Sequence, residues 1–259
     1  MTPEQKRSAK EGFAHAKNSM QALERDYPGL WAQLDRMRAE RPVEWPDWCL
    51  LPMGAAVAVA QTNPLALKDH TIAQISALYA WRYSRSVYLV DNRLLGQLLN
   101  QVPDALTLDD FTGLPEWCVY VREADPHPEW PGLGLWAHLE HDANTGRPEL
   151  RLLLDFADGA PMPIPVYLDR GSVTEAIGDA VATAMQTLQT GSTGADVRGG
   201  DLSVAHAEFA ERVDAYLSVV AYLSRPEADI VHAQRPGARP VKPRKPKKDN
   251  DVWLVGSSL

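Results

Sequence analysis

The apolar residues of this chain change their spacing twice along its length. Between Phe13 and Leu23, and again up to about residue 100, they recur three or four positions apart. From Trp117 to Leu168 they alternate with polar residues in short runs, and after Ser172 the helical spacing returns. Because side chains repeat every 3.6 residues on a helix and every two on a strand, this order predicts helices, then a sheet, then helices. The expected fold class is therefore α+β.

The alternating part predicts an antiparallel four-stranded sheet within residues 117–168. A hairpin turn is expected at residues 142–146, where Asn and Gly tolerate a positive φ. Prolines in the last strand, residues 163–168, favour an edge position for it. Helices are expected over residues 4–26, 30–41, 65–84, 91–100, 172–189 and 203–224. The N-terminal helices and the two C-terminal helices should pack on the sheet.

The charge of the chain is unevenly distributed. Residues 235–248 contain seven cations and no acid, with prolines between many of the cations. Since the net charge of the whole chain is −8, the other 245 residues carry −15. Alternating prolines and cations prevent helix formation and favour an extended, solvated chain. We therefore expect a single α+β domain over residues 1–232, with a helical part at 1–100 and the sheet and later helices at 114–225, followed by a basic, proline-rich extended tail at 233–259.

Cysteine content and hydropathy are typical of a reduced, cytoplasmic protein. Cys49 and Cys118 are too few for a disulfide framework or a zinc cluster, and both are expected to be free thiols. The longest apolar run, residues 50–60, is shorter than the roughly 20 residues that cross a bilayer. We therefore expect no membrane contact and a cytoplasmic location.

No motif for catalysis or cofactor binding stands out. The glycine-rich stretch at residues 191–194 lacks the lysine that a phosphate-binding loop requires. His138 and His141 lie three positions apart on an expected strand, so they should point to opposite faces and not bind one metal ion. The sequence thus predicts a protein that is not an enzyme and that has no cofactor or metal.

A divergent metal-dependent nuclease is the enzymatic alternative. Nucleases of this kind gather carboxylates around Mg²⁺. The carboxylates that would do so here are Asp155, Asp158, Asp169 and Glu175. Nothing in the sequence fixes them within reach of one ion.

Aromatic and arginine side chains gather between residues 81 and 88. Trp81, Arg82, Arg85 and Tyr88 combine large contact areas with directed polar groups, a combination typical of binding hot spots. A core helix whose arginines extend into solvent would give the same pattern. We select these four residues as partner-binding anchors.

The most specific string in the chain is Leu-Pro-Glu-Trp-Cys-Val-Tyr-Val at residues 114–121. It contributes Trp117 and Tyr120, which we expect to support the anchors from below and add to the partner-binding set. Further marks occur in order along the chain at Leu78–Arg82, Tyr88, Asp91, Asp155–Phe156, Ser172–Val173, Glu175, Glu227, Asp229 and Ile230. With these residues the chain resembles the type V-A anti-CRISPR family, which blocks biogenesis of the RNA-guided type V-A effector nuclease, and that family's plasmid and mobile-element homologues. The resemblance covers roughly residues 66–255.

The resemblance implies a regulator encoded by a mobile element that recognises a nascent polypeptide of its target and lowers expression of the encoding mRNA. The implied partners are a peptide segment of the target protein, with the ribosome or the mRNA beside it. Such a protein binds rather than catalyses, in agreement with the lack of a catalytic motif.

A plasmid nucleic-acid-binding protein is the second alternative. It would act through the basic tail, because clustered cations bind phosphate backbones. The residues selected for this role are Lys242, Arg244, Lys245, Lys247 and Lys248.

Overall fold

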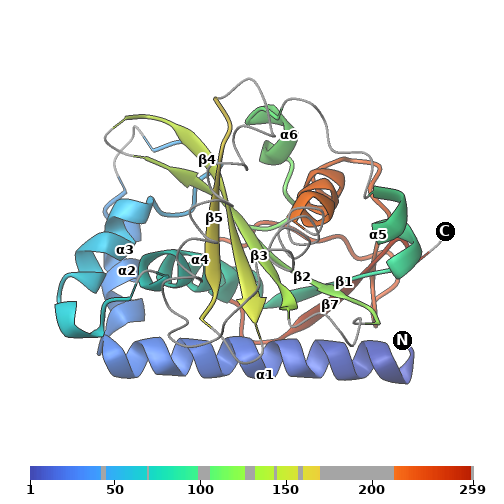
Figure 1. Ribbon diagram of the computed structural model, residues 1–259, viewed down its shortest axis with the longest axis horizontal. Coiled ribbons are helices and arrows are strands. Elements are labelled where there is room, and N and C mark those ends of the chain that lie inside the picture. Colours follow the sequence, from blue (N-terminus) through green and yellow to red (C-terminus); the bar gives the residue numbers. More distant parts are fainter. Residues whose placement is uncertain are drawn as a thin grey trace, which may run out of the picture.

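The computed structural model describes residues 1–41, 45–68, 70–98, 106–125, 132–142, 145–156, 160–169 and 213–257. These residues form a seven-stranded sheet with helices on both of its faces (Figure 1). The helices are α1 (Pro3–Asp26), α2 (Leu30–Ala39), α3 (Met53–Ala60), α4 (Thr71–Ser84), α5 (Asn92–Leu98) and α6 (Asp109–Thr112), with a further helix over residues 213–223. The strands are β1 (Ser86–Val90), β2 (Cys118–Glu123), β3 (Gly132–His141), β4 (Pro148–Phe156), β5 (Met162–Tyr167), β6 (Ile230–His232) and β7 (Asp251–Val255).

The fold class is α+β, but the sheet is mixed and larger than expected. Its order is β5-β4-β3-β2-β1-β7-β6, with β1 parallel to both β2 and β7 and the other neighbouring pairs antiparallel. The run β2-β3-β4-β5 follows the expected hairpin order, and β5 with its prolines lies at an edge. The prediction of an antiparallel four-stranded sheet is nevertheless wrong, because β1, β7 and β6 extend the sheet beyond β2. Ser86 pairs with Asp251, a contact too distant in sequence for a local pattern to show.

The C-terminal segment contributes to the body of the protein. β7 pairs with β1 along its whole length, and Trp253 and Val255 are buried. The expectation of an extended tail over residues 233–259 is therefore wrong for residues 251–255, whose alternating apolar side chains build a strand inside the sheet. Residues 235–250 contain no helix or strand.

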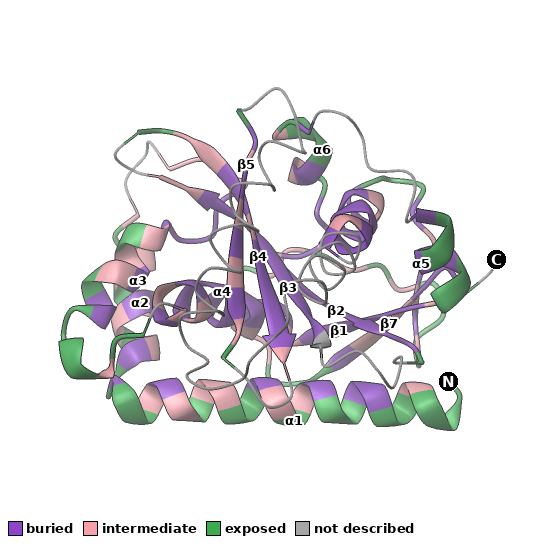
Figure 2. Cartoon of the chain, in the orientation of Figure 1, coloured by how far each residue is buried: buried purple, intermediate pink, exposed green. Residues whose placement is uncertain are grey.

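Alternate residues of the strands face two separate hydrophobic clusters. On β1, Val87 and Leu89 join the cluster formed with α1–α4, whereas Tyr88 and Val90 join the cluster formed with α5, α6 and residues 213–223. Figure 2 shows the central strands buried between these layers, while α1 exposes its outer side. A sheet covered on both faces explains why every residue of β1 and β2 is buried.

Most of the predicted helices are confirmed within a few residues. α4 begins at Thr71 because residues 64–66 form a separate 3₁₀ turn, and α3 was not predicted. Residues 213–223 are helical as expected. The predicted helix over residues 172–189 and the first part of the helix over residues 203–224 lie outside the described residues. Among the helices that the structure describes, none is both long and apolar enough to cross a membrane.

Candidate functional site

A group of arginine and aromatic side chains lies where α2 packs against α4. Its members, called here the aromatic–arginine cluster, are Trp31, Asp35 and Arg38 from α2 and Tyr79, Arg82 and Tyr83 from α4. The guanidinium of Arg82 donates from Nη1 and Nη2 to the two carboxylate oxygens of Asp35, at 3.3 and 3.1 Å. Its Cζ lies 5.3 Å from the ring centroid of Trp31 and 5.4 Å from that of Tyr79. Such a planar ion pair between rings holds Arg82 in one orientation.

Arg38 extends this cluster toward the C-terminal segment. Its Cζ lies 4.6 Å from the Tyr83 ring centroid, and its Nη1 donates to the Tyr83 hydroxyl at 3.0 Å and to the carbonyl oxygen of Arg244 at 3.3 Å. The Tyr79 hydroxyl donates to Asp35 at 3.0 Å, and burial raises the pKa of that hydroxyl, which keeps it protonated. The cluster is therefore ordered without a partner, which lowers the entropic cost of binding one.

The structure separates the predicted anchors. Arg82 belongs to the cluster, with 15% of its side chain exposed. Trp81 and Tyr88 are buried at 1% and 0% exposure, so they support the fold and offer no surface to a partner. Residue type alone suggests them as anchors, because the sequence of residues 81–88 does not reveal which face of the helix or strand points inward.

The two supporting residues lie in different surroundings. Tyr120 is buried and stacks on Trp136 with 4.3 Å between ring centroids, beneath α1. Trp117 is half-buried, and its indole Nε1 donates to the carbonyl oxygen of Pro243 at 2.7 Å. Neither residue contacts Arg82 in any hydrogen bond or ring contact of the described part of the chain.

The proline-rich segment over residues 235–250, called here the strap, is bonded to the body at several points. The amide of Lys247 donates to the carbonyl oxygen of Tyr83 at 3.3 Å, and Arg85 Nη1 donates to the carbonyl oxygen of Lys248 at 3.0 Å. Together with the bonds from Arg38 and Trp117, these contacts place the strap beside the aromatic–arginine cluster. This contact could not be predicted from the sequence, because proline-rich basic segments are usually solvated.

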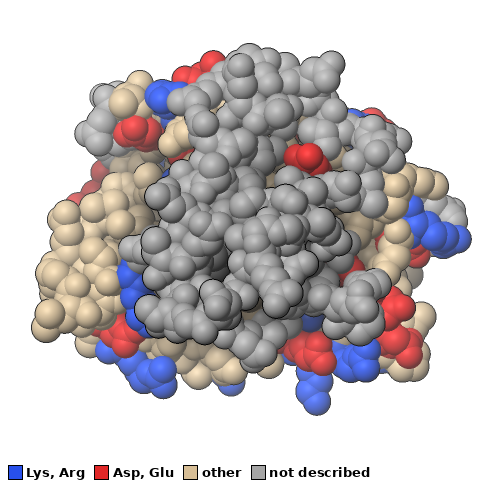
Figure 3. Space-filling view, in the orientation of Figure 1, with Lys and Arg blue, Asp and Glu red and all other residues tan. Residues whose placement is uncertain are grey.

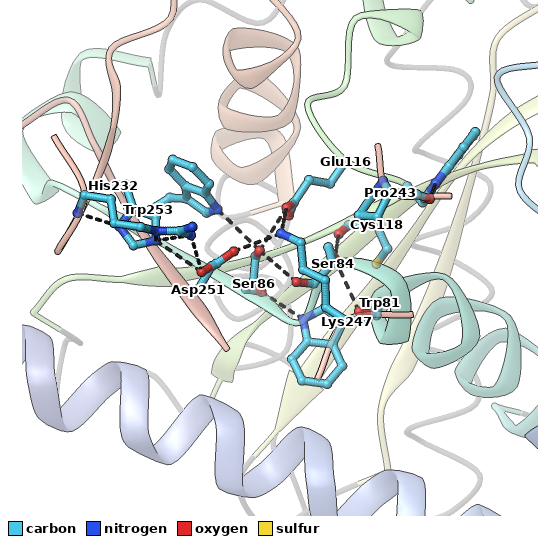
Figure 4. A network of polar contacts seen from close by, with 12 residues as sticks. Trp81, Ser84, Ser86, Glu116, Cys118, His232, Pro243, Lys247, Asp251 and Trp253 are labelled. Carbon is cyan, nitrogen blue, oxygen red and sulfur yellow. Dashed lines mark hydrogen bonds and ion pairs between the residues drawn. The ribbon is translucent and has the colours of Figure 1, made fainter. Parts of the chain in front are cut away.

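Beneath the strap lies a buried carboxylate, Glu116 (Figure 4). Its Oε1 accepts a hydrogen bond of 2.9 Å from the Ser86 hydroxyl and lies 3.7 Å from Nζ of Lys247. Burial raises the pKa of Glu116 to about 7, although Lys247 and Ser86 act in the opposite direction. Glu116 is the acid of the residue 114–121 string, and a charged residue inside an apolar run is a sequence signal for such a site.

Lys247 binds a second carboxylate at the start of β7. Its Nζ lies 2.8 Å from Asp251 Oδ2, while Arg235 Nη2 and His232 Nε2 lie 2.6 and 3.2 Å from Oδ1. Burial alone would raise the pKa of Asp251, but the hydrogen bonds from Lys247 and His232 outweigh burial and lower the pKa. Sequence reasoning missed this group, because its members come together only when β7 joins the sheet.

Two of the four carboxylates considered for metal binding, Asp155 and Asp169, have other partners. Asp155 is 1% exposed; its Oδ2 accepts from the Tyr120 hydroxyl at 2.6 Å, and its Oδ1 lies 2.7 Å from His15 Nε2. Asp169 forms a two-point ion pair with Arg147 at 2.7 and 2.8 Å. Asp158 and Glu175 lie outside the described residues. Within the described ranges, no group of three or more His, Cys, Asp or Glu could hold a metal ion.

Both cysteines are free and buried, as predicted. Burial raises the pKa of the Cys49 and Cys118 thiols, which keeps them protonated and unreactive. Cys118 pairs across the strands with His138, which is buried and lies 2.8 Å from Glu140.

Comparison with known proteins shows which fold and which family this chain shares. The chain is similar to a crystal structure of AcrVA2, with a TM-score of 0.63 and 18% identity over 94% of this chain and 84% of that one. At this identity the likeness shows the fold. No curated protein matches the chain. The model of the AcrVA2-like family, described as the anti-CRISPR type V subtype A2 family, matches residues 88–259. Since this match spans more than half of the sequence, the chain belongs to the anti-CRISPR type V subtype A2 family.

Proposed function

We propose that this protein is an anti-CRISPR inhibitor that binds a nascent polypeptide segment of its target and thereby lowers expression of the encoding mRNA. Membership of the anti-CRISPR type V subtype A2 family supports the inhibitory role. The partner is then a segment of the type V-A effector, met in the cytoplasm while it is being synthesised. The activity is binding, and the loss of the message follows from it through the ribosome or a host factor.

The aromatic–arginine cluster is the observation that supports peptide binding most strongly. Peptide-binding hot spots are rich in Trp, Tyr and Arg, because these side chains contribute area and directed hydrogen bonds at low conformational cost. Arg82 and Arg38 are already stacked on aromatic rings and bonded at fixed positions. Asp35, with 41% of its side chain exposed, adds an acceptor at the same place.

The nuclease alternative has less support. Asp155 is a buried carboxylate of the candidate set, yet both of its oxygens are engaged by Tyr120 and His15. Through these contacts Asp155 connects His15 of α1 with Tyr120 of the sheet, which is a structural role. We therefore propose a protein without catalytic activity of its own.

The proposal is tested by Arg82→Ala in cells that express the type V-A nuclease, with the protein and mRNA levels of the nuclease as readouts. Loss of a hot-spot arginine costs about 1–3 kcal/mol of binding, so the variant should lose most of its inhibition. Arg147→Ala is a matched control, because Arg147 also forms a two-point ion pair with an aspartate and stacks on a tyrosine, at 4.8 Å. It should inhibit like wild type.

Since Arg82 also joins α2 to α4, the melting temperature of each variant is measured alongside. Arg38→Gln is a second test, because it changes a half-buried side chain at the same surface. Full inhibition by both folded variants would show that the peptide binds elsewhere.

A further inference from the structure

We infer that the outer side of the strap is a binding ridge for the phosphate backbone of RNA. The first observation is that the backbone of the strap is held at four successive places. Carbonyl oxygens of Pro243, Arg244 and Lys248 accept hydrogen bonds from Trp117, Arg38 and Arg85, and the amide of Lys247 donates to Tyr83. A basic segment fixed in this way presents its charges at constant positions.

The cations of the strap divide into two sets. Three cations, called here the inward set, are bound to the body: Lys247 and Arg235 bind Asp251, and Lys242 donates to the carbonyl oxygen of Thr112 at 3.0 Å. A second set is exposed and forms no ion pair with any other described residue. Its members are Arg239, Arg244, Lys245 and Lys248. The inward set attaches the strap, and the outward set remains available for a ligand.

Two half-buried arginines from the body add positive charge beside the strap. Arg38 and Arg85 donate to strap carbonyl oxygens, so their guanidinium groups lie against the strap. Arg85 has a φ of 50°, the left-handed conformation that favours glycine at the end of a helix. A side chain retained at such a position points to a role for that side chain.

The charge balance favours a partner of high negative charge density. The strap contains seven cations against one acid, Asp249, and the adjacent Asp251 of β7 is already bound by Lys247 and Arg235. The remainder of the protein is strongly acidic and repels polyanions at long range. A ligand must therefore carry closely spaced charges that bind the ridge itself, as a nucleic-acid backbone does.

The ridge should bind RNA without reading its sequence. Trp117, the aromatic residue under the strap, has Lys242 at 5.4 Å from its ring centroid and is only half exposed, so base stacking is not its role. Contacts to phosphates then supply the affinity, which makes binding strongly dependent on salt. This inference goes beyond the proposed function, because it requires no peptide target.

The test measures binding of the full-length protein to a fluorescent oligouridylate of about 20 nucleotides, a length that exceeds common single-strand site sizes. Fluorescence anisotropy is recorded over a range of salt concentrations. In the triple variant R244A/K245A/K248A the affinity should fall at least tenfold at low salt. The slope of log K against log salt should decrease by about 2, given roughly 0.7 per phosphate contact.

The matched control is K6A/R7A/K10A, which removes the same charge from exposed positions on α1. Along the lower edge of the face in Figure 3, where α1 runs, basic and acidic side chains are interspersed. This control should bind the RNA within twofold of wild type. Equal losses in the two triple variants, or undiminished binding by R244A/K245A/K248A, would overturn the inference. So would competition by polyglutamate as effective as competition by unlabelled RNA, which would assign the ridge to acidic peptides.

Discussion

The indole nitrogen of Trp117 donates a hydrogen bond of 2.7 Å to the carbonyl oxygen of Pro243, 126 residues later in the chain. This bond connects the residue 114–121 string to the strap. Since the same string supplies Glu116 beneath Lys247 and begins β2 at Cys118, it organises the strap and the sheet together.

Replacing Trp117 with phenylalanine should loosen the strap. The variant lacks the indole donor and leaves the Pro243 carbonyl without that partner, at a cost of about 1–2 kcal/mol. Trypsin should then cut faster after Arg244, Lys247 and Lys248, which mass spectrometry of the early fragments would show. Trp45→Phe is the control, since Trp45 is also half-buried against the same hydrophobic cluster, but its indole forms no hydrogen bond to the strap within the described residues. Unchanged cleavage in Trp117→Phe would mean that other contacts alone hold the strap.

Replacing Glu116 with glutamine should change how stability depends on pH. The folded-state pKa of Glu116 is about 7, raised from an ordinary value of 4.5. A raised pKa means that its contribution to stability is present below about pH 4.5 and is lost as the pH rises to about 7. Relative to wild type, Glu116→Gln should therefore gain about 3 kcal/mol of unfolding free energy across this window.

Urea unfolding at several pH values between 4.5 and 8 measures this difference. Glu227→Gln is the control, because Glu227 is exposed; its free energy of unfolding should change with pH as that of wild type does. Lys247→Met should raise the pKa of Glu116 further, because Lys247 lowers it. A constant offset between Glu116→Gln and wild type would contradict a buried, titrating Glu116.

A close approach between α1 and β2 makes Gly12 sensitive to substitution. A Cβ at Gly12 would lie 2.7 Å from Cδ of Arg122 and 3.1 Å from Cε1 of Tyr120. Gly12→Ala should therefore destabilise the protein by about 1–3 kcal/mol through overpacking. Gly54→Ala on α3 has nothing within 4 Å and should instead stabilise by about 0.5–1 kcal/mol. Thermal melting of the two variants checks the opposite signs, and a stabilising Gly12→Ala would show that α1 is not fixed at this distance.

The sequence revealed the parts of the fold that depend on local pattern. The helical spacing in α1 and the alternation in β5 follow directly from the burial of one face of each element. The pairing of β1 with β7 was not predictable in this way, because parallel strands are joined by long connections and carry no turn signal. The valines and Trp253 of β7 are typical of a strand, but the prolines and cations that precede them in the sequence are typical of an extended tail.

The candidate site was only partly visible in the sequence for a related reason. Arg82 is suggested as an anchor by the aromatic and arginine residues near it between positions 81 and 88. Its partners Trp31 and Asp35, however, lie on another helix. Their spacing of four positions on α2 places them on one face, which is the signal that could have indicated them. Trp81 and Tyr88 were selected by residue type alone, and burial assigns them to the core.

Recognition of a nascent polypeptide is tested most directly by capturing the protein from bacteria that synthesise the type V-A nuclease and sequencing the attached messages. Two altered nuclease genes separate peptide from RNA recognition: a synonymously recoded gene keeps the polypeptide and changes the RNA, and an early frameshift does the reverse. We predict that the nuclease message is enriched, that enrichment persists with the recoded gene, and that it is lost with the frameshifted gene and after puromycin release of nascent chains. Enrichment that survives the frameshift but is lost on recoding would contradict peptide recognition.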